Sequence, residues 1–93
     1  MTEYDGITKI YELFKRKLDK YIVNKATLCL GQLFKAREIN DSEMRKDIIK
    51  HLKTLINDED EWIKIDSILR LYDLAQNEVN KAEIEKDGFV IPT

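Results

Sequence analysis

Apolar residues recur along most of this chain at spacings of three and four, which is the period of a helix that buries one face. The first such segment runs from about Ile7 to Lys17, and a second runs from Asp19 or Lys20 to about Ala36. The apolar stripe of the first is Ile7, Ile10, Tyr11, Phe14 and Leu18. The stripe of the second is Ile22, Ala26, Leu30, Leu33 and Phe34, whereas Lys25, Gln32 and Lys35 should face water.

A third helix follows the polar link EIND, with Asp41 and Ser42 as the pair that offers an N-cap. We expect it to end near Asn57. Its stripe is Met44, Ile48, Ile49, Leu52, Leu55 and Ile56.

Four consecutive acids at 58–61 precede the last strongly apolar segment. Asn57 or Asp58 can cap a fourth helix, and carboxylates in its first turn favour the positive end of the helix dipole. We interpret the acidic run as a helix start, rather than as a site for a metal ion or a basic partner.

Composition favours helix throughout. The chain has 93 residues, of which 43% are hydrophobic and 37% are charged, with three Gly and one Pro. This length suits one domain with a single modest core, and the scarcity of turn residues and of β-branched alternation argues against a sheet. The prediction is one all-α domain over residues 1–93 with four helices.

The two halves of the chain share one apolar pattern. A shift of 41 residues lays Ile7 on Ile48, Tyr11 on Leu52, Phe14 on Leu55, Ile22 on Ile63, Leu30 on Leu71 and Leu33 on Leu74. The same shift lays Ala26 on Ser67 and Asp19 on Asp60. We therefore expect one repeat over about 7–37, a second over about 43–80, and a C-terminal tail at 87–93.

The stretch LINDEDEWIKIDSILRLYDL resembles the turn and second helix of a HEAT repeat, of the HEAT and armadillo class. The matching positions are Asp58, Asp60, Ile63, Lys64, Ser67, Leu71 and Leu74. The first half matches at Ile22, Ala26, Leu30, Gly31 and Leu33, but has Val23 where the family has a basic residue, and LDKY at the turn. The resemblance covers about residues 7–76 and implies a right-handed stack of two helical hairpins that holds other macromolecules. A simple four-helix bundle is the alternative.

Few residues here are suited to chemistry. The single His51 and the single Cys29 give no metal-ligand spacing and no catalytic pair, so we expect a non-enzyme without cofactor or metal. We interpret His51 as a partly buried helix residue and Cys29 as a packing residue.

The start MTEYDGITK lacks the features of a signal peptide, and no apolar stretch approaches the roughly 18 residues of a membrane span, which predicts a cytoplasmic protein.

Charge is unevenly distributed. Residues 1–40 hold eight Lys/Arg against five Asp/Glu, and residues 41–93 hold eight against thirteen. A basic cluster in the first half consists of Lys15, Arg16, Lys17 and Lys20. Cations are favoured at a helix C-terminus by the dipole, so we interpret this cluster as a solvated helix end, and nucleic-acid binding as the less favoured alternative.

The predicted fourth helix is apolar on two sides. One face is made of Ile63, Ser67, Leu71 and Leu74, and the other is made of Trp62, Ile65, Leu69 and Tyr72. The corresponding stripe of the second helix is weaker and consists of Tyr21, Asn24, Leu28 and Gly31. Either the tail covers the stronger face through Phe89, Val90 and Ile91, or a protein partner or a second copy of the chain does.

The leading hypothesis is a small interaction module, adaptor or subunit that uses this face, including as a homodimer. The alternative is a small acidic regulatory or immunity-type inhibitor, and a weak nucleic-acid binder is less favoured.

Overall fold

A computed structural model describes residues 3–16 and 19–92, and all regular structure within these residues is helical. The helices are α1 (Glu3–Arg16), α2 (Lys20–Leu33), α3 (Ser42–Leu55), α4 (Glu61–Ala75) and α5 (Glu78–Glu85). The all-α prediction is confirmed. The fifth helix was not expected as a separate element. It arises because the Asn77 side chain accepts hydrogen bonds from the backbone N–H groups of Val79 and Asn80 and so starts a new helix.

Aspartate side chains cap the starts of the three helices α2, α3 and α4. Asp41 accepts from two backbone N–H groups of α3, as predicted. Asp19 caps α2 and Asp60 caps α4, so two residues 41 apart have the same role. The cap of α4 was predicted at Asn57 or Asp58, and this was wrong. Asp58 instead accepts from the N–H of Asp60 at 2.8 Å, and this turn keeps residues 58–60 outside the helix.

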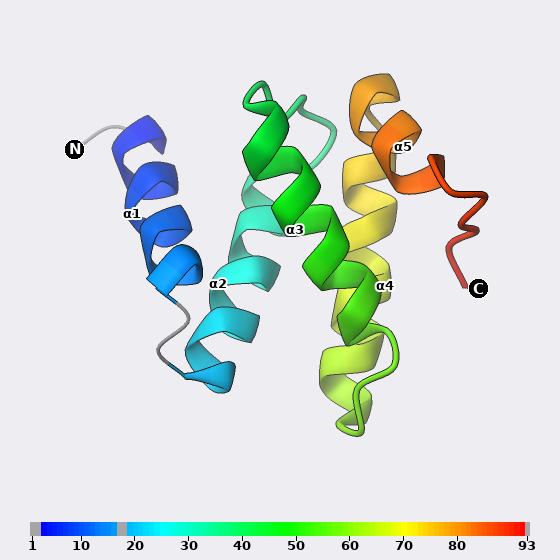
Figure 1. The fold of residues 1–93 in the computed structure, drawn as a ribbon, viewed down its shortest axis with the longest axis horizontal. Helices are drawn as coiled ribbons and strands as arrows, with labels where there is room; N and C mark the ends of the chain where they lie inside the picture. Colours follow the sequence, from blue (N-terminus) through cyan, green and yellow to red (C-terminus); the bar gives the residue numbers. More distant parts are fainter. Residues whose placement is uncertain (1–2, 17–18, 93) are drawn as a thin grey trace.

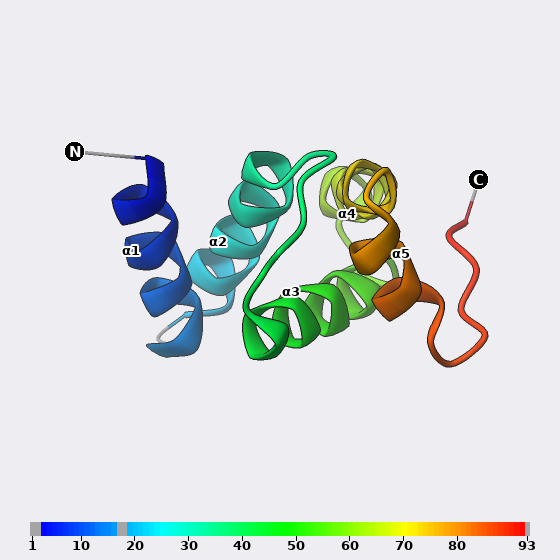
Figure 2. The ribbon, with the colours of Figure 1, turned by 90° about the horizontal axis from the view of Figure 1, so that it is seen from above.

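The helices form two layers. In Figure 1 the chain crosses the molecule from α1 at one end to the tail at the other, and α2 and α4 run in the same direction. Figure 2 shows α3 and α5 on one side of α2 and α4, with α1 at one end of the molecule beside α2. The smallest extent of the backbone is 18 Å, as expected for two layers of helices.

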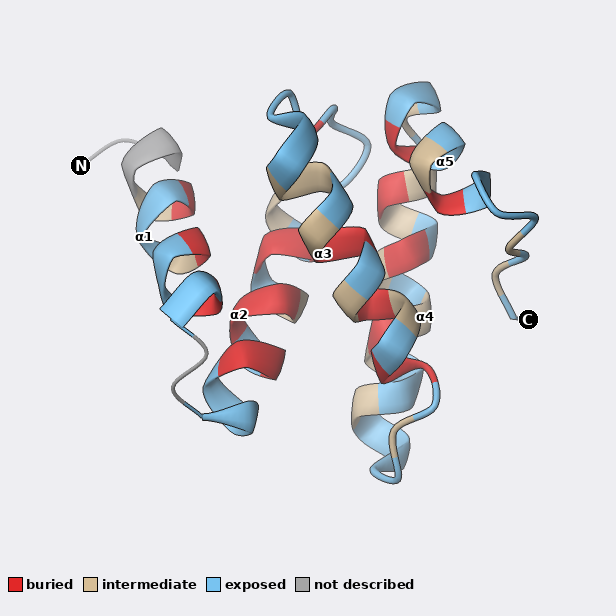
Figure 3. Cartoon of the chain, in the orientation of Figure 1, coloured by how far each residue is buried: buried red, intermediate tan, exposed pale blue. Residues whose placement is uncertain are grey.

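The core lies between these layers (Figure 3). Its central residues come from all five helices: Ile7, Tyr11 and Phe14 of α1, Leu30 of α2, Ile48 and Leu52 of α3, Leu71 and Leu74 of α4, and Ile84 of α5. Most of the predicted stripes are therefore confirmed as core positions. Leu18, predicted to be buried, and Lys17, predicted to end the first helix, lie outside the described residues.

Helix α2 departs from its prediction in three respects. Ile22 was expected in the core but is 38% exposed, and its neighbour Val23 is buried instead. Cys29 was expected to pack inside but is exposed. Both errors have one cause, because successive helical residues point about 100° apart and the buried face lies on the side of Val23. The helix also ends at Leu33 and not Ala36, which adopts a positive φ of 57° and donates its N–H to Asp73 of α4.

The link between α2 and α3 was expected to be polar, yet its Ile39 is fully buried. Asn80 of α5 fixes it there, because its side chain accepts from the N–H of Ile39 at 3.1 Å and donates to the carbonyl oxygen of Arg37. Arg45 of α3 also donates to the carbonyl oxygen of Ile39, at 2.8 Å. The fifth helix is thus connected to the middle of the chain through hydrogen bonds of one buried amide.

Helices α2 and α4 approach closely at Gly31. A Cβ atom at this position would lie 2.9 Å from the Cβ of Arg70. The Nε atom of Arg70 lies 3.2 Å from a carboxylate oxygen of Asp73, one turn along α4. A glycine on one helix and the base of an arginine side chain on the other therefore set the spacing between these helices.

Candidate functional site

One side of α4 carries the predicted partner-binding residues, and no other helix within the described residues covers it. Trp62 is 82% exposed, Ile65 and Leu69 are 48% exposed, and Tyr72 is 40% exposed. The opposite side of the helix is fully buried at Ser67, Leu71 and Leu74. Helix α4 is therefore apolar on two sides, of which only one faces the core. We refer to Trp62, Ile65, Leu69 and Tyr72 as the α4 face.

The tail reaches one end of the α4 face. The Tyr72 hydroxyl donates to the carbonyl oxygens of Pro92 at 3.2 Å and of Ile91 at 3.5 Å. Trp62 lies ten residues earlier, about 15 Å along the helix. Phe89 and Ile91 pack against the core, whereas Val90 is 80% exposed. The tail thus lies beside Tyr72 and leaves the rest of the α4 face exposed.

The corresponding stripe of α2 is mostly covered. Asn24 is 4% exposed, and its side-chain oxygen accepts from Nε2 of His51 on α3 at 2.9 Å. Gly31 is buried against Arg70, and Leu28 is half-buried. Tyr21 remains exposed and lines, together with Trp62, a cavity of about 240 Å³ between α2 and α4. Helices α3 and α4 therefore cover most of the α2 stripe.

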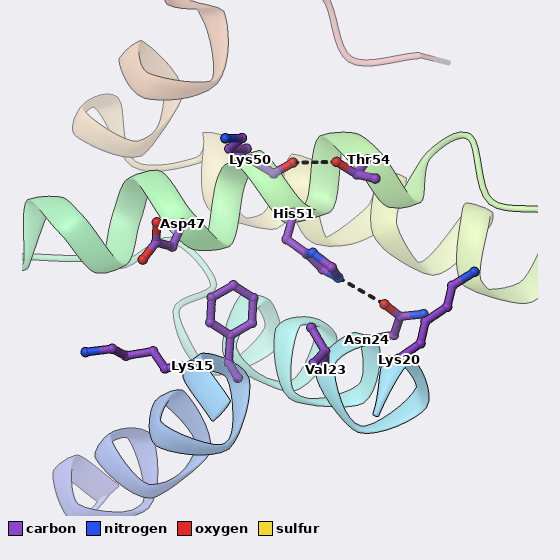
Figure 4. A pocket seen from close by; sticks show the side chains of 9 residues that line it. Lys15, Lys20, Val23, Asn24, Asp47, Lys50, His51 and Thr54 are labelled. Carbon is purple, nitrogen blue, oxygen red and sulfur yellow. Dashed lines mark hydrogen bonds between the residues drawn. The ribbon is translucent and has the colours of Figure 1, made fainter. Parts of the chain in front are cut away.

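A second hollow lies between α1, α2 and α3 and has a volume of about 610 Å³ (Figure 4). His51 points across it toward Asn24, and the ring of Phe14 meets His51 edge-on. The residues that line it are Phe14, Lys15, Lys20, Val23, Asn24, Asp47, Lys50, His51 and Thr54.

The predicted basic cluster does not form one patch around this hollow. Lys15 lies over the ring of Tyr11, and Lys20 pairs with Asp58 at 3.9 Å. Arg16 is exposed on α1 and is not among the lining residues, and Lys17 lies outside the described residues. Lys50 lines the hollow but was missed, because the sequence gives no sign that position 50 approaches the second helix.

Tyr11 and Asp47 join α1 to α3. The Tyr11 hydroxyl donates to a carboxylate oxygen of Asp47 at 3.0 Å. The pKa of Tyr11 is raised well above its ordinary value by burial, by this hydrogen bond, and by the negative charges of Asp47, Glu43 and Asp41. The phenol therefore remains protonated and acts as a fixed donor between the two helices.

The other residues considered for chemistry lie apart. His51 is half-buried on α3, as predicted. Among the residues that the structure describes, no three His, Cys, Asp or Glu side chains are placed to hold a metal ion together. No helix in residues 3–16 and 19–92 has the length and apolar character required to cross a membrane.

Comparison of the chain with protein-family models, with curated proteins and with solved structures found no match. The exposed α4 face is therefore the feature from which a function is derived.

Proposed function

We propose that this protein is a small non-enzymatic interaction module, an adaptor or subunit, that binds a protein partner through the α4 face. The observation that carries the proposal is the exposure of Trp62, Ile65, Leu69 and Tyr72 on a helix whose opposite side already forms the core. Trp and Tyr are among the residue types most enriched at the energetic centres of protein interfaces. A continuous apolar face with two such aromatics favours contact with another macromolecule over contact with water.

The arrangement of the other helices supports the proposal. Helix α4 and helix α3 cover the α2 stripe at Asn24, Leu28 and Gly31, which lie 41 residues before Ile65, Leu69 and Tyr72. Helix α5 lies against both α3 and α4, in the same layer as α3 (Figure 2). A helix laid on the α4 face would therefore continue the row formed by α2 and α4. The resemblance of the sequence to HEAT repeats supports the same function, because stacks of this kind usually hold macromolecules.

A photo-reactive amino acid placed at position 62 or 69 tests this function directly. After irradiation in the cells that make the protein, we expect a covalent adduct to a protein partner from both positions. The matched control is the same amino acid at Leu13, which is 41% exposed on α1 at the opposite end of the molecule. Adducts no more abundant from positions 62 and 69 than from position 13 would contradict the proposal.

A further inference from the structure

The order of residue types along the α4 face is symmetric, with an aromatic residue at each end and two aliphatic residues between them. These residues, Trp62, Ile65, Leu69 and Tyr72, are separated by three, four and three positions, a spacing that reads the same in both directions. We propose that the partner is a second copy of this chain, bound through antiparallel packing of α4 against α4 about a two-fold axis at the level of Ser67. This proposal rests on the proposed function, since it names the occupant of the same surface.

The spacing satisfies the condition that a two-fold interface imposes. In such an interface, if residue i contacts residue j of the other copy, then j must contact i. With the axis at the level of Ser67, Trp62 of one copy meets Tyr72 of the other, and Ile65 meets Leu69. Each aromatic residue then faces an aromatic one and each aliphatic residue an aliphatic one. The antiparallel arrangement also places opposite ends of the two helix dipoles side by side.

The chain itself argues against the simplest alternative, a further helix packed as α4 packs on α2. That packing depends on Gly31, where a Cβ atom would already lie 2.9 Å from Arg70. The position 41 residues later is Tyr72, whose side chain points to the tail and not into the core. A parallel helix packed on α4 at the interhelical distance of α2 and α4 would therefore collide with Tyr72. In the antiparallel arrangement, Trp62 of the second copy would instead stack beside Tyr72.

The opposite end of the molecule is unsuited to be the complementary surface. The outer side of α1 exposes Lys9, Glu12, Lys15 and Arg16, with Leu13 as its one large exposed apolar side chain among the described residues. An α4 face docked on this charged surface would generate a ring or an open filament, with its apolar residues buried against charged side chains. A closed dimer through α4 buries both apolar faces at once.

The size of the surface is consistent with a dimer if the tail contributes to it. A stable interface removes about 800 Å² from each partner, and four side chains on one helix provide only the centre of such an area. Val90 of the tail is 80% exposed and follows directly on Phe89, which packs against the core. Together with the first turn of α4, the tail would form the rim of the interface, with the Tyr72 hydroxyl bond to the tail intact.

A charge-exchange experiment tests this pairing. The mass of the intact chain in solution is expected to be twice 11.0 kDa, and Ile65→Lys and Leu69→Glu alone are each expected to reduce it to 11.0 kDa, because a charge would face an apolar side chain. Mixing the two variants in equal amounts should restore the dimer mass. The lysine introduced in one copy would then pair with the glutamate introduced in the other, while the second pair remains apolar. Val79→Lys, on the exposed part of α5, is the matched control and should remain dimeric.

The possible failures are distinguishable. Circular dichroism of each variant verifies that the helices remain folded, as expected for substitutions at half-exposed positions. An intact chain of 11.0 kDa at every concentration overturns the dimer, yet leaves the proposed function standing if the photo-reactive residue at position 62 still captures another protein. A dimer that survives both substitutions, or one that mixing does not restore, overturns the antiparallel pairing. A disulfide formed between Ile65→Cys and Leu69→Cys chains, both with Cys29→Ser, provides an independent measurement of the same contact.

Discussion

Gly31 shows at the residue scale how one missing side chain sets a helix-to-helix distance. Adding a methyl group inside a helix normally gains up to about 1 kcal/mol of stability. At Gly31 this gain is opposed, because the new Cβ would lie 2.9 Å from Cβ of Arg70 and the overpacking would push α2 and α4 apart. Such overpacking typically costs about 1–3 kcal/mol.

We therefore predict that Gly31→Ala lowers the free energy of unfolding, measured by urea denaturation, by up to about 2 kcal/mol net. Gly6→Ala is the matched control, because Gly6 is also helical but nothing lies within 4 Å of a Cβ placed there. It should leave stability unchanged or raise it by up to about 1 kcal/mol. A stabilising Gly31→Ala would show that the two helices are not in close contact at this position.

Single residues were predictable to the extent that helical spacing defines a face. Leu30, Ile48 and Leu71 are buried as the stripes indicated. The spacing did not distinguish Ile22 from Val23, because two adjacent residues fit a helical stripe almost equally well. The packing of the neighbouring helices decides which of the two is buried. The burial of Asn24 was also not predictable, since its partner His51 comes from a helix 27 residues away.

Asn80 is the residue whose hydrogen bonds join helix α5 to the rest of the molecule. Its amide satisfies the N–H of Ile39 and the carbonyl oxygen of Arg37, both in the link between α2 and α3. Removing a partner from buried polar groups costs about 1–3 kcal/mol for each group left unsatisfied.

Asn80→Ala is therefore expected to reduce the free energy of unfolding by at least about 2 kcal/mol, because two backbone groups lose their partner. Hydrogen exchange at the Ile39 N–H should accelerate in the same variant. Asn40→Ala, at an exposed position in the same link, is the control and should have little effect on either measurement. Equal stability of the two variants would mean that α5 is not fixed to the link by this amide.

At the scale of elements, the starts of helices were predictable where an aspartate cap precedes an apolar stripe, as at Asp41. The start of α4 was misplaced because four consecutive acids offer several caps, and only the turn made by Asp58 selects Asp60. The fifth helix was not separated from the fourth, because the cap at Asn77 lies within a continuous helical pattern.

At the scale of the whole molecule, the exposed α4 face and the tail lie at the same end of the structure. The all-α class followed from helical periodicity together with composition, and the apolar α4 face followed from the spacing within a single helix. What covers that face could not be derived from spacing, because the tail carries no periodic pattern. In the structure the tail runs beyond α4 and α5 (Figure 1), with Phe89 beneath Lys53 and Ile91 packed against the core.

We expect a chain ending at Lys86 to lose about 1–3 kcal/mol of its free energy of unfolding, because the half-buried Phe89 and Ile91 no longer remove apolar surface from water. The measurement is best made with Ile65→Lys also present, so that the proposed dimer does not contribute to stability. Phe89→Ser and Ile91→Ser should each reproduce part of the loss, whereas Val90→Ser should not, since Val90 is 80% exposed. If truncation and Val90→Ser were equally harmless, the tail would not be part of the folded structure. The α4 face would then extend without a rim to Tyr72, and the dimer would have to form without the tail.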